Sequence, residues 1–365
     1  MSSPSGGQAR AGLATLAEVP HCDEIIDVRS PAEYAEDHIP GAVNCPVLDD
    51  AQRAEVGTLY KQVSPFAAKK LGAALIARNI GEHLLARFQD RPKHWKPLVY
   101  CWRGGMRSGA LVTVLRSVGW NASQLDGGYK GYRRAVIERL ETLPQCLTFR
   151  VLCGPTGSAK TRTLQALGTL GEQIVDLEGL ARHKGSVLGV LPGQPQPNQK
   201  WFESGLLAVL AALDPARPVY VEAESRKIGR LQVPESLLQA IRRGSCVCIE
   251  ATPAARVDFL LRDYDYFTLD PAWLKSRLAA LQGVQSNETL ARWAGLAEGG
   301  HWPALVAALL DEHYDPLYHR SQGVNFAGFT DPQRFPSDDL SDAGIARLAA
   351  QIARSAATQE VPSAA

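Results

Sequence analysis

The chain has 365 residues, of which 45% are hydrophobic and 21% are charged, and its formal net charge is +1. This length suggests two or three domains, and both fractions are ordinary for a soluble protein. The near-zero net charge excludes a global basic field, so any bound nucleic acid must contact a local patch. No apolar run approaches the roughly 18 residues of a transmembrane helix.

The composition of the two termini predicts that they are disordered, and the cysteine pattern predicts a cytoplasmic protein. Residues 1–11 are polar and rich in Gly and Ser, without a signal-peptide core, and residues 355–365 are similar, so both are predicted to be disordered. The seven cysteines are an odd set without a Cys-x-x-Cys pair. A disulfide framework or a cysteine zinc site is therefore not expected, and the sequence identifies no certain metal site.

The first part of the chain alternates short apolar strands with helices. Strands are predicted at residues 24–29 and 97–100. Helices are predicted at residues 66–80 and 110–118, and they end at Gly81 and Gly119. Ser30, Pro31 and Glu33 supply the elements of a capping box for a short helix after the first strand. Asp27 and Arg29 are expected to be structural, as an ion pair or a cap.

The segment from Tyr100 to Gly109 is the most informative one in this part. It places Cys101 at a turn between a strand and a helix, with Arg103 and Arg107 close in sequence. Backbone N–H groups of such a turn, the helix dipole and the two arginines all favour negative charge. The pKa of the Cys101 thiol should therefore be lowered, which would make it a nucleophile. We predict that Cys101, Arg103 and Arg107 are catalytic.

A second motif follows a strand predicted at residues 147–153. A glycine-rich loop leads into Lys160-Thr161 and a helix, which is the sequence context of a P-loop. Its backbone amides would cradle phosphates, the lysine would neutralise them, and Thr161 would face a magnesium ion if one is used. The predicted phosphate-binding residues are Gly154, Thr156, Gly157, Ser158, Lys160 and Thr161.

Ala159 departs from the P-loop pattern G-x-x-x-x-G-K-[ST], which has glycine at this position. If the backbone there needs a positive φ, alanine costs on the order of 1 kcal/mol. The affinity of the loop for a nucleotide is therefore left open, and an unused glycine turn is the alternative.

Acidic and basic residues at the ends of later strands suggest further roles. Asp176 and Glu222 could hold magnesium or orient water, as a Walker B acid does, or could cap helices. Lysine, arginine and aromatic side chains in the neighbouring connections suit an RNA backbone and a stacked base, with solvated loop charges as the alternative. These candidates for RNA binding are His183, Lys184, Lys200, Trp201 and Arg226. From residue 254 onward, helices are predicted.

Four segments, in this order, resemble a rhodanese domain. They are Asp27-Val-Arg-Ser-Pro-Ala-Glu-Tyr, His38-Ile-Pro-Gly-Ala-Val-Asn, the Cys101 loop and Asp126-Gly-Gly-Tyr. Members of that family carry sulfur or selenium on a loop cysteine, as a persulfide or perselenide. The spacing of Cys101 and Arg107 also fits a cysteine-dependent phosphatase. Tyr100 rather than histidine precedes the cysteine, however, and the upstream segments favour rhodanese.

Other segments resemble the tRNA 2-selenouridine synthases, which are fusions of a rhodanese and a P-loop domain, over roughly residues 20–330. The segments are Glu55-Val-Gly-Thr-Leu-Tyr-Lys, Val175-Asp-Leu-Glu-Gly-Leu-Ala-Arg-His-Lys-Gly-Ser, Gln196-Pro-Asn-Gln-Lys-Trp-Phe-Glu-Ser and Val221-Glu-Ala-Glu-Ser-Arg-Lys-Ile-Gly. The resemblance implies that 2-thiouridine becomes 2-selenouridine at the wobble position of the tRNAs for Lys, Glu and Gln. It implies selenophosphate as the selenium donor and selenophosphate synthetase as a candidate partner. It also implies geranylation of the sulfur from geranyl diphosphate, and selenium then displaces the S-geranyl group.

On this resemblance, the Lys160 loop would hold the diphosphate rather than ATP, because neither prenyl transfer nor the displacement requires ATP hydrolysis. Cys101 would carry selenium as a perselenide or otherwise assist its delivery, and the two arginines would hold the selenophosphate or the chalcogen anion. No tightly bound cofactor is expected. Selenophosphate and geranyl diphosphate are substrates, and Mg²⁺ is a candidate ion.

The predicted fold is α/β in both parts. Residues 12–145 form a rhodanese-like domain with a parallel sheet, and residues 146–354 form a P-loop NTPase-like domain with a mainly helical C-terminal portion. The apolar pocket for a geranyl group is expected to draw on that helical portion. Two other functions stay open: a thiosulfate sulfurtransferase with a regulatory nucleotide-binding domain, and a non-catalytic RNA-binding NTPase.

Overall fold

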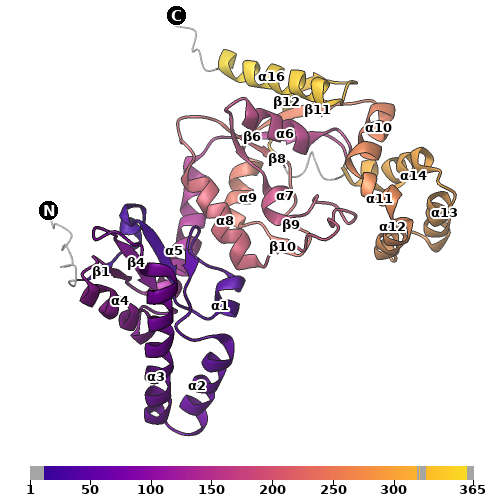
Figure 1. Ribbon diagram of the computed structural model, residues 1–365. Coiled ribbons are helices and arrows are strands. Elements are labelled where there is room, and N and C mark those ends of the chain that lie inside the picture. Colours follow the sequence, from indigo (N-terminus) through magenta and orange to yellow (C-terminus); the bar gives the residue numbers. More distant parts are fainter. Residues whose placement is uncertain (1–11, 319, 321–325, 360–365) are drawn as a thin grey trace, which may run out of the picture. The chain divides into compact units, whose positions relative to one another are not determined.

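The computed structural model describes residues 12–318, 320 and 326–359. Apart from Glu203–Gly205, the chain divides into two compact α/β units, one ending at Arg139 and the other beginning at Leu140 (Figure 1). Residues 1–11 and 360–365, which were predicted to be disordered, lie outside the described residues. Within the described ranges, no helix is both long and apolar enough to cross a membrane.

The first unit is built on a five-stranded, fully parallel sheet with the strand order β1-β5-β4-β2-β3. The strands are β1 (Leu13–Ala14), β2 (Glu24–Asp27), β3 (Val43–Asn44), β4 (Pro97–Tyr100) and β5 (Ser123–Leu125). The helices are η1 (Leu16–His21), α1 (Pro31–Glu36), α2 (Asp50–Gln62), α3 (Pro65–His83), η2 (Leu84–Phe88), α4 (Met106–Val118) and α5 (Gly128–Thr142). Because β4 is the central strand, the Cys101 loop that follows it lies at the middle of one sheet edge.

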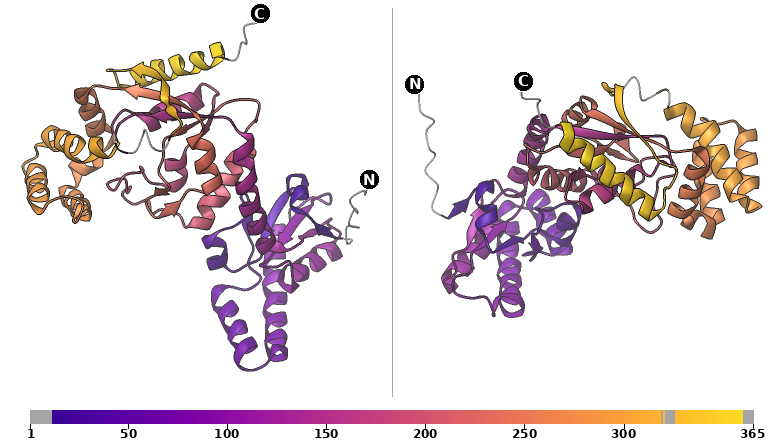
Figure 2. Two further views of the ribbon diagram at one scale, coloured as in Figure 1. Left: turned by 180° about the vertical axis from the view of Figure 1, so that it is seen from behind. Right: turned by 90° about the horizontal axis from the view of Figure 1, so that it is seen from above.

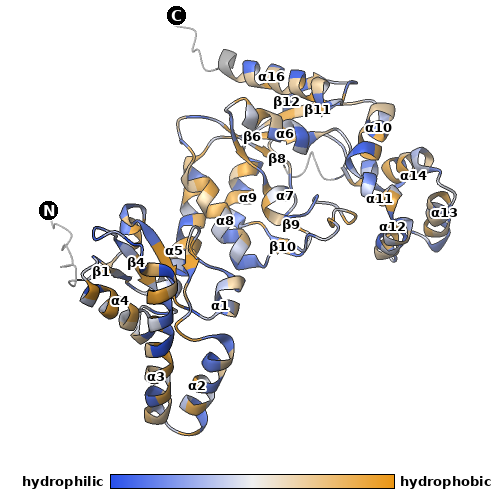
Figure 3. Ribbon diagram, in the orientation of Figure 1, coloured by the Kyte–Doolittle hydropathy of each residue, from blue (hydrophilic) through white to orange (hydrophobic). Residues whose placement is uncertain are grey.

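The core of this unit explains why its helices form where they do. Apolar residues of β2, β4, α3, η2 and α4 form one buried cluster, and Figure 3 shows β4 in the hydrophobic colour. Gly119 ends α4 with φ +109°, as predicted. The predicted helix end at Gly81 is wrong, because α3 continues to His83 and into η2. Ile80 and Phe88 are buried on either side of Gly81, so packing outweighs the low helix propensity of glycine.

The second unit has a parallel sheet with the strand order β12-β11-β6-β8-β7 and a separate hairpin of β9 and β10. The strands are β6 (Phe149–Cys153), β7 (Gln173–Val175), β8 (Val219–Glu222), β9 (Lys227–Ile228), β10 (Leu231–Gln232), β11 (Ser245–Glu250) and β12 (Gly328–Pro336). The accompanying helices are η3 (Leu143–Cys146), α6 (Lys160–Thr169), α7 (Leu177–Ala181), α8 (Gln199–Ala211), α9 (Glu235–Arg242) and α16 (Asp342–Gln359).

Helices cover both faces of this second sheet. Leu164 and Leu167 of α6 pack with Leu348 and Ile352 of α16 and with buried residues of β8 and β11, so α6 and α16 share one face. Figures 1 and 2 show α8 and α9 on the opposite side of the sheet from α16. This arrangement is expected for right-handed crossovers that leave the central strand in both directions. The loop after β6 therefore lies at the centre of the sheet, at the switch point where ligands usually bind.

A group of helices follows β11. They are α10 (Pro253–Asp263), α11 (Asp265–Leu269), α12 (Pro271–Leu278), η4 (Ala279–Leu281), α13 (Asn287–Glu298), α14 (Trp302–Leu309) and η5 (Leu310–Tyr314). The helical C-terminal portion is thus confirmed, with two corrections. β12 is a strand inside it, which its prolines concealed; Pro332 and Pro336 are tolerated because β12 is an edge strand. Residues 355–359, predicted to be disordered, continue α16, where the Ser355 hydroxyl contacts Arg150 of β6.

Candidate active sites

Cys101 follows β4 directly and is buried beneath the loop that leads to α4. The backbone N–H of Gly105 donates a hydrogen bond to the Cys101 Sγ at 3.2 Å, and the Ser108 hydroxyl lies 3.1 Å from the same sulfur. Gly104 has φ +65°, and a Cβ there would lie 2.6 Å from the Leu125 carbonyl oxygen. The loop therefore requires glycine at this position to close over the sulfur.

These hydrogen-bond donors control the pKa of the Cys101 thiol. Burial by itself would raise the pKa of the Cys101 thiol. Hydrogen bonds from the Ser108 hydroxyl and from the backbone N–H groups of Ser108, Gly105 and Arg103 outweigh this effect and lower that pKa below its usual value. The predicted activated cysteine is therefore supported, although hydrogen bonds rather than guanidinium charges cause the activation.

The two predicted arginines do not surround the sulfur equally. The Arg107 guanidinium donates to the Glu33 carboxylate at 2.8 Å, and it is this pairing that lowers the pKa of Glu33 against the effect of burial. Arg107 thus binds the loop to α1 in the structure, and its expected role as an anion holder stays a prediction. Arg103 is exposed, and in the described part of the chain no side chain forms an ion pair with it. Arg103 is the better candidate to receive an anion at this loop.

The Ser108→Ala variant should react more slowly with alkylating agents at Cys101. A hydrogen bond to a charged group contributes about 1.5–3 kcal/mol, so losing it should cut the alkylation rate near neutral pH by at least roughly tenfold. Peptide mass spectrometry after iodoacetamide treatment at several pH values would measure this rate. Ser117→Ala is the control, because Ser117 lies on the exposed side of α4 and bonds only its own helix. An unchanged rate profile would contradict the role of Ser108.

Asp27 and Arg29 form the structural pair that the sequence predicts. Their side chains lie 2.6 Å apart and are almost fully buried. Arg29 also donates to the Asp37 carbonyl oxygen at 2.6 Å and lies over the Tyr129 ring at 3.8 Å. This network fixes the end of β2 beside the Cys101 loop without offering a free group to a substrate.

The loop between β6 and α6 has the geometry of a phosphate-binding loop. Gly154 has φ +153°, and a Cβ there would lie 2.5 Å from the Ser158 hydroxyl and 2.9 Å from the Ile249 carbonyl oxygen. Lys160 begins α6, and its ammonium group donates to the carbonyl oxygens of Gly154 at 2.8 Å and Pro155 at 3.3 Å. The lysine therefore curls over the loop, where a phosphate group would meet its charge.

Ala159 adopts the left-handed conformation that the motif requires of glycine, with φ +59° and ψ 28°. Relief of this strain by glycine would gain about 1–2 kcal/mol. The Ala159 methyl group, however, is buried against Phe259, Leu340 and Ile345, and losing it costs about 0.8 kcal/mol. The backbone freedom of glycine costs about another 0.5–1 kcal/mol. These effects nearly cancel, so packing compensates for the departure from the motif.

The Ala159→Gly variant should therefore change the free energy of unfolding by less than about 1 kcal/mol. Denaturant unfolding of the variant and the parent protein would measure the difference. Ala159→Val is the contrasting variant, because a β-branched side chain is strongly disfavoured at positive φ and should destabilise the protein by more than about 2 kcal/mol. A gain of 2 kcal/mol or more in Ala159→Gly would show that the methyl group does not compensate.

Three glutamates meet in the cleft beside the phosphate loop. Carboxylate oxygens of Glu178, Glu222 and Glu224 all lie within 4.8 Å of one another. Glu222 is 3% exposed, and its Oε1 has no hydrogen-bond partner in the described part of the chain. The hydroxyl of Thr161 donates to Glu178 at 3.2 Å. We call this hollow of about 640 Å³, which the phosphate loop, the glutamates and Lys184 line, the phosphate-loop cleft.

Burial and mutual repulsion perturb all three carboxyl groups. Burial, followed by the charge of a neighbouring glutamate, raises the pKa of Glu178 and Glu222 to about 8 and that of Glu224 to about 7. Asp176, the other predicted acid, accepts a hydrogen bond from the Gly179 N–H at 2.7 Å and caps α7. The capping alternative is therefore correct for Asp176, while Glu222 belongs to the acidic cluster.

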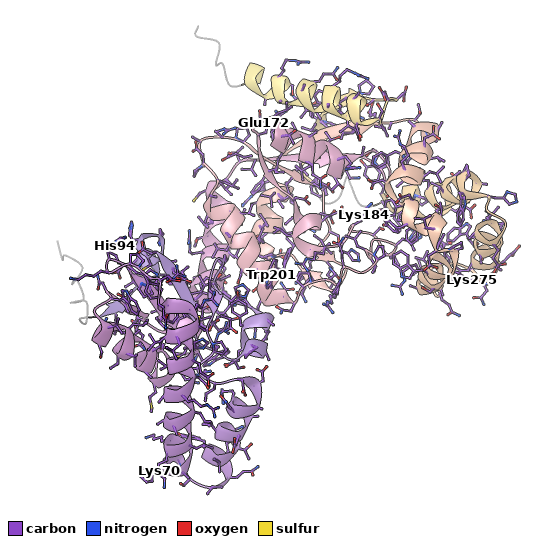
Figure 4. The ribbon with its side chains drawn as sticks, viewed as in Figure 1. Lys70, His94, Glu172, Lys184, Trp201 and Lys275 are labelled. Carbon is purple, nitrogen blue, oxygen red and sulfur yellow. The ribbon has the colours of Figure 1, made fainter. Side chains whose placement is uncertain are left out.

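The predicted tRNA-binding residues do not form one surface. His183 is 4% exposed, and burial lowers its pKa, so in this structure its ring offers no exposed surface for the predicted contact with RNA. Lys184 pairs with Asp263 at 2.6 Å and forms a wall of the phosphate-loop cleft. Figure 4 shows Lys184 and Trp201 well apart.

The remaining candidates differ in exposure. Trp201 is half-buried on α8, with the Arg182 guanidinium 5.4 Å from its ring centre, and Lys200 beside it is also half-buried. Arg226 is exposed just before β9. Only Arg226 thus has the exposure expected of a free RNA contact, and the cation–π pair on Trp201 leaves that ring less available for stacking on a base.

Sequence reasoning missed three residues of these sites. Glu224 follows Glu222 by two residues at a strand end, a spacing that places both on one side and could have revealed the pair. Glu178 follows Asp176 in the same way, but the capping geometry that separates their roles is not visible in the sequence. Ser108 gave no local signal, because its contact with Cys101 depends on how the loop closes.

The fold and these two sites define a class of protein: a rhodanese-like domain joined to a phosphate-loop α/β domain. Residues 11–135 match the model of the rhodanese-like domain, and residues 147–286 match that of the tRNA 2-selenouridine synthase AAA domain. The chain belongs to the tRNA 2-selenouridine synthase family. It is 38% identical over 326 residues to the tRNA 2-selenouridine synthase of Alcanivorax borkumensis, a match that covers 80% of this chain and 88% of that protein. It is 37% identical over 268 residues to the one from Nitrosomonas europaea, covering 72% and 68% of the two chains.

Proposed function

We propose that this protein replaces the sulfur of 2-thiouridine by selenium at the wobble position of tRNA, through an S-geranyl intermediate. The observation that best supports this proposal is the presence, in one chain of this family, of an activated Cys101 and a phosphate loop with its lysine in place. The first site suits a chalcogen, and the second suits a diphosphate.

The first step is geranyl transfer. The sulfur on C2 of the base attacks C1 of geranyl diphosphate, a C–S bond forms, and the C–O bond to the diphosphate breaks. The base loses its N3 proton, and diphosphate leaves. Lys160 and the backbone N–H groups at the start of α6 would stabilise the negative charge that develops on the departing diphosphate. Neither the bond that forms nor the bond that breaks requires ATP.

The second step exchanges sulfur for selenium. Geranylthiolate is a better leaving group from C2 than an unalkylated sulfur. Selenium from selenophosphate bonds to C2, the C2–S bond breaks, geranylthiol leaves, and water cleaves the P–Se bond to release phosphate. This balance needs no oxidant or reductant. Cys101 with Arg103 would hold or deliver the selenium. A perselenide on Cys101 is the alternative route: the thiolate attacks selenium, the P–Se bond breaks with phosphite as the two-electron-reduced leaving group, and a thiol must later split the Se–S bond, forming a disulfide with Cys101.

A divalent cation fits the acidic cluster. Glu222 has a buried oxygen without a partner, and carboxylate oxygens of Glu178 and Glu224 lie close enough to complete a set of hard ligands. Thr161 would contribute its hydroxyl from the first turn of α6. A magnesium ion bound there would neutralise diphosphate charge, while Lys160 orients the same group from the loop.

Magnesium should stabilise this protein more strongly at high pH than at low pH. The pKa values of Glu178 and Glu222 are raised to about 8 and that of Glu224 to about 7, so their favourable contribution to folding is complete below the ordinary value of 4.5 and is lost as pH rises through 7 to 8. Bound Mg²⁺ removes the repulsion in the ionised cluster. We expect a Tm increase of roughly a few degrees with Mg²⁺ at about pH 8.5 and little at about pH 6.

Thermal unfolding with and without Mg²⁺ would measure this difference. The Glu222→Gln variant should lose the Mg²⁺ response, whereas Glu235→Gln on α9, which lies outside the cluster, should keep it. A response that is equal at both pH values, or equal in Glu222→Gln and the parent protein, would show that the cation binds elsewhere.

The proposed tRNA substrates are those for Lys, Glu and Gln that carry 2-thiouridine at position 34. Because the net charge is only +1, binding has to rely on local cations such as the exposed Arg103 and Arg226. Selenophosphate synthetase is the proposed supplier of the selenium donor.

Nucleoside analysis tests the proposed function directly. The purified protein would be incubated with 2-thiouridine tRNA, geranyl diphosphate and selenophosphate, and the wobble nucleosides would be measured by mass spectrometry. We expect S-geranyl-2-thiouridine without selenophosphate and 2-selenouridine with it. Sulfur transfer from thiosulfate to cyanide, with no change in the tRNA, would instead support a plain sulfurtransferase.

A further inference from the structure

An apolar cavity of about 80 Å³ lies within the helical portion of the second unit. Side chains from α10, α11, α12 and α14 line it, among them Leu260, Phe267, Leu274, Trp302, Leu305 and Val306. None of the described residues that line it is charged. By the rule that a water needs roughly 10–15 Å³ of such space, the cavity has room for a chain of several carbon atoms.

The apolar cavity adjoins the phosphate-loop cleft. Thr156 of the phosphate loop lines both hollows. Leu260 of α10 and Tyr264, the residue that follows α10, also line both. Ser186 and Tyr314 are also shared, and their hydroxyls lie 3.5 Å apart. The two hollows therefore share part of their walls, so the apolar cavity lies beside a ligand whose phosphates are on the loop.

The structure fixes the cavity wall to the phosphate loop. Arg256 of α10 is 4% exposed, and its Nε donates to the Thr156 carbonyl oxygen at 2.8 Å. The same guanidinium makes two bonds to the Asp315 carboxylate, at 2.6 and 3.0 Å. One buried arginine thus holds the loop, α10 and the segment after η5 together, so the distance from phosphate site to apolar cavity is set by the fold.

The chemistry of the two hollows differs sharply. The phosphate-loop cleft offers Lys160, Arg162, Lys184 and four carboxylates. The apolar cavity offers leucine and aromatic surface, and Phe267 on its wall stacks on Trp273 with ring centres 4.9 Å apart. A nucleobase needs hydrogen-bond partners for its edge, and an apolar wall would leave those groups unsatisfied. An amphiphile with a charged head and a hydrocarbon tail matches both surfaces.

We propose that the apolar cavity binds the hydrocarbon tail of a short isoprenyl diphosphate whose diphosphate lies on the Lys160 loop. This inference rests on the proposed function, which requires geranyl diphosphate, and it names the residues that would receive the geranyl chain. It also favours an isoprenyl diphosphate over a nucleotide as the occupant of the loop, because the cavity that adjoins the phosphate-loop cleft is apolar.

Calorimetric titration of the full chain, without tRNA, tests the tail site. Inorganic diphosphate and geranyl diphosphate would be the two probes, with Mg²⁺ present. We expect the parent protein to bind geranyl diphosphate at least tenfold more tightly than diphosphate. Two variants fill the cavity from different walls: Val306→Trp on α14 and Thr268→Phe on α11. Each should lower geranyl diphosphate affinity about tenfold and leave diphosphate affinity within twofold.

Matched control variants lie on the same helices but outside the cavity. Ala304→Trp on α14 and Leu269→Phe on α11 place the same bulk at exposed positions and should bind both probes as the parent protein does. If geranyl diphosphate binds no more tightly than diphosphate, or if the filled variants keep the full preference, the tail site is refuted while the phosphate loop stands. If neither probe binds the parent protein, the proposed function fails and the inference fails with it.

Discussion

The Cys101→Ser variant should lose selenium incorporation into tRNA by at least about 100-fold while retaining most geranyl transfer. A serine hydroxyl stays protonated near neutral pH, so the hydrogen bonds from Gly105 and Ser108 have no anion to stabilise. In the proposed mechanism, geranyl transfer depends on the Lys160 loop of the other unit and does not use the thiol. S-geranyl-2-thiouridine should therefore accumulate in the variant, and mass spectrometry of wobble nucleosides would measure both products.

The control is Cys146→Ser, which removes an exposed cysteine that lies in neither candidate site. Intact-protein mass spectrometry after treatment with selenophosphate separates the two selenium routes, because only a perselenide adds the mass of selenium to the parent protein. Full selenation in Cys101→Ser would refute the assignment of this cysteine. Equal loss of geranylation and selenation would instead indicate a folding defect, which circular dichroism would reveal.

The Lys160→Ala variant should lose geranyl transfer by about 100-fold or more, since preorganised positive charge at a leaving group typically contributes that much. Its ammonium group stands over the loop, bonded to the carbonyl oxygens of Gly154 and Pro155, and no other described lysine occupies the loop itself. Selenation would fall with it, because the unalkylated sulfur is a poor leaving group. The rate of S-geranyl-2-thiouridine formation at saturating tRNA measures the effect.

Synthetic or isolated tRNA that already carries S-geranyl-2-thiouridine separates an effect on geranyl transfer from an effect on selenation. On that substrate the Lys160→Ala variant should form 2-selenouridine at a rate near that of the parent protein, because the first step is bypassed. Lys227→Ala, at an exposed position on β9, is the matched control and should keep both activities. Normal geranylation by Lys160→Ala would place the diphosphate elsewhere.

Local patterns predicted the elements that hold the sites. The capping box at Ser30 and Glu33 is present in the structure, and strands end and helices begin on either side of Cys101 and of the phosphate loop. The conformation of Ala159 was also foreseeable, because the P-loop motif has glycine at this position, where the backbone adopts a left-handed conformation. Such features depend on contacts within a few residues, which a sequence records directly.

The charges of the sites were harder to predict. Arg107 was expected to serve the cysteine, but it pairs with Glu33, 74 residues away. Glu178 lies in the segment after β7 and Glu222 is the last residue of β8, and the two meet because those strands are neighbours in the sheet. His183 is of a residue type that can contact RNA, but its side chain is buried. In each case the partner is set by strand order and packing, not by distance along the chain.

The sequence by itself determined the two-part α/β organisation, the reactive cysteine turn, the phosphate loop and the family. Each of these depends on short segments whose residues impose a strict local geometry. Only the tertiary structure decided which groups activate Cys101, which acids form the cluster, and where an apolar chain can lie beside the phosphates. Those outcomes depend on side chains from distant segments that meet in a low-dielectric interior. There a hydrogen bond or a like charge shifts a pKa strongly, and the shape of a cavity depends on the packing of several helices at once.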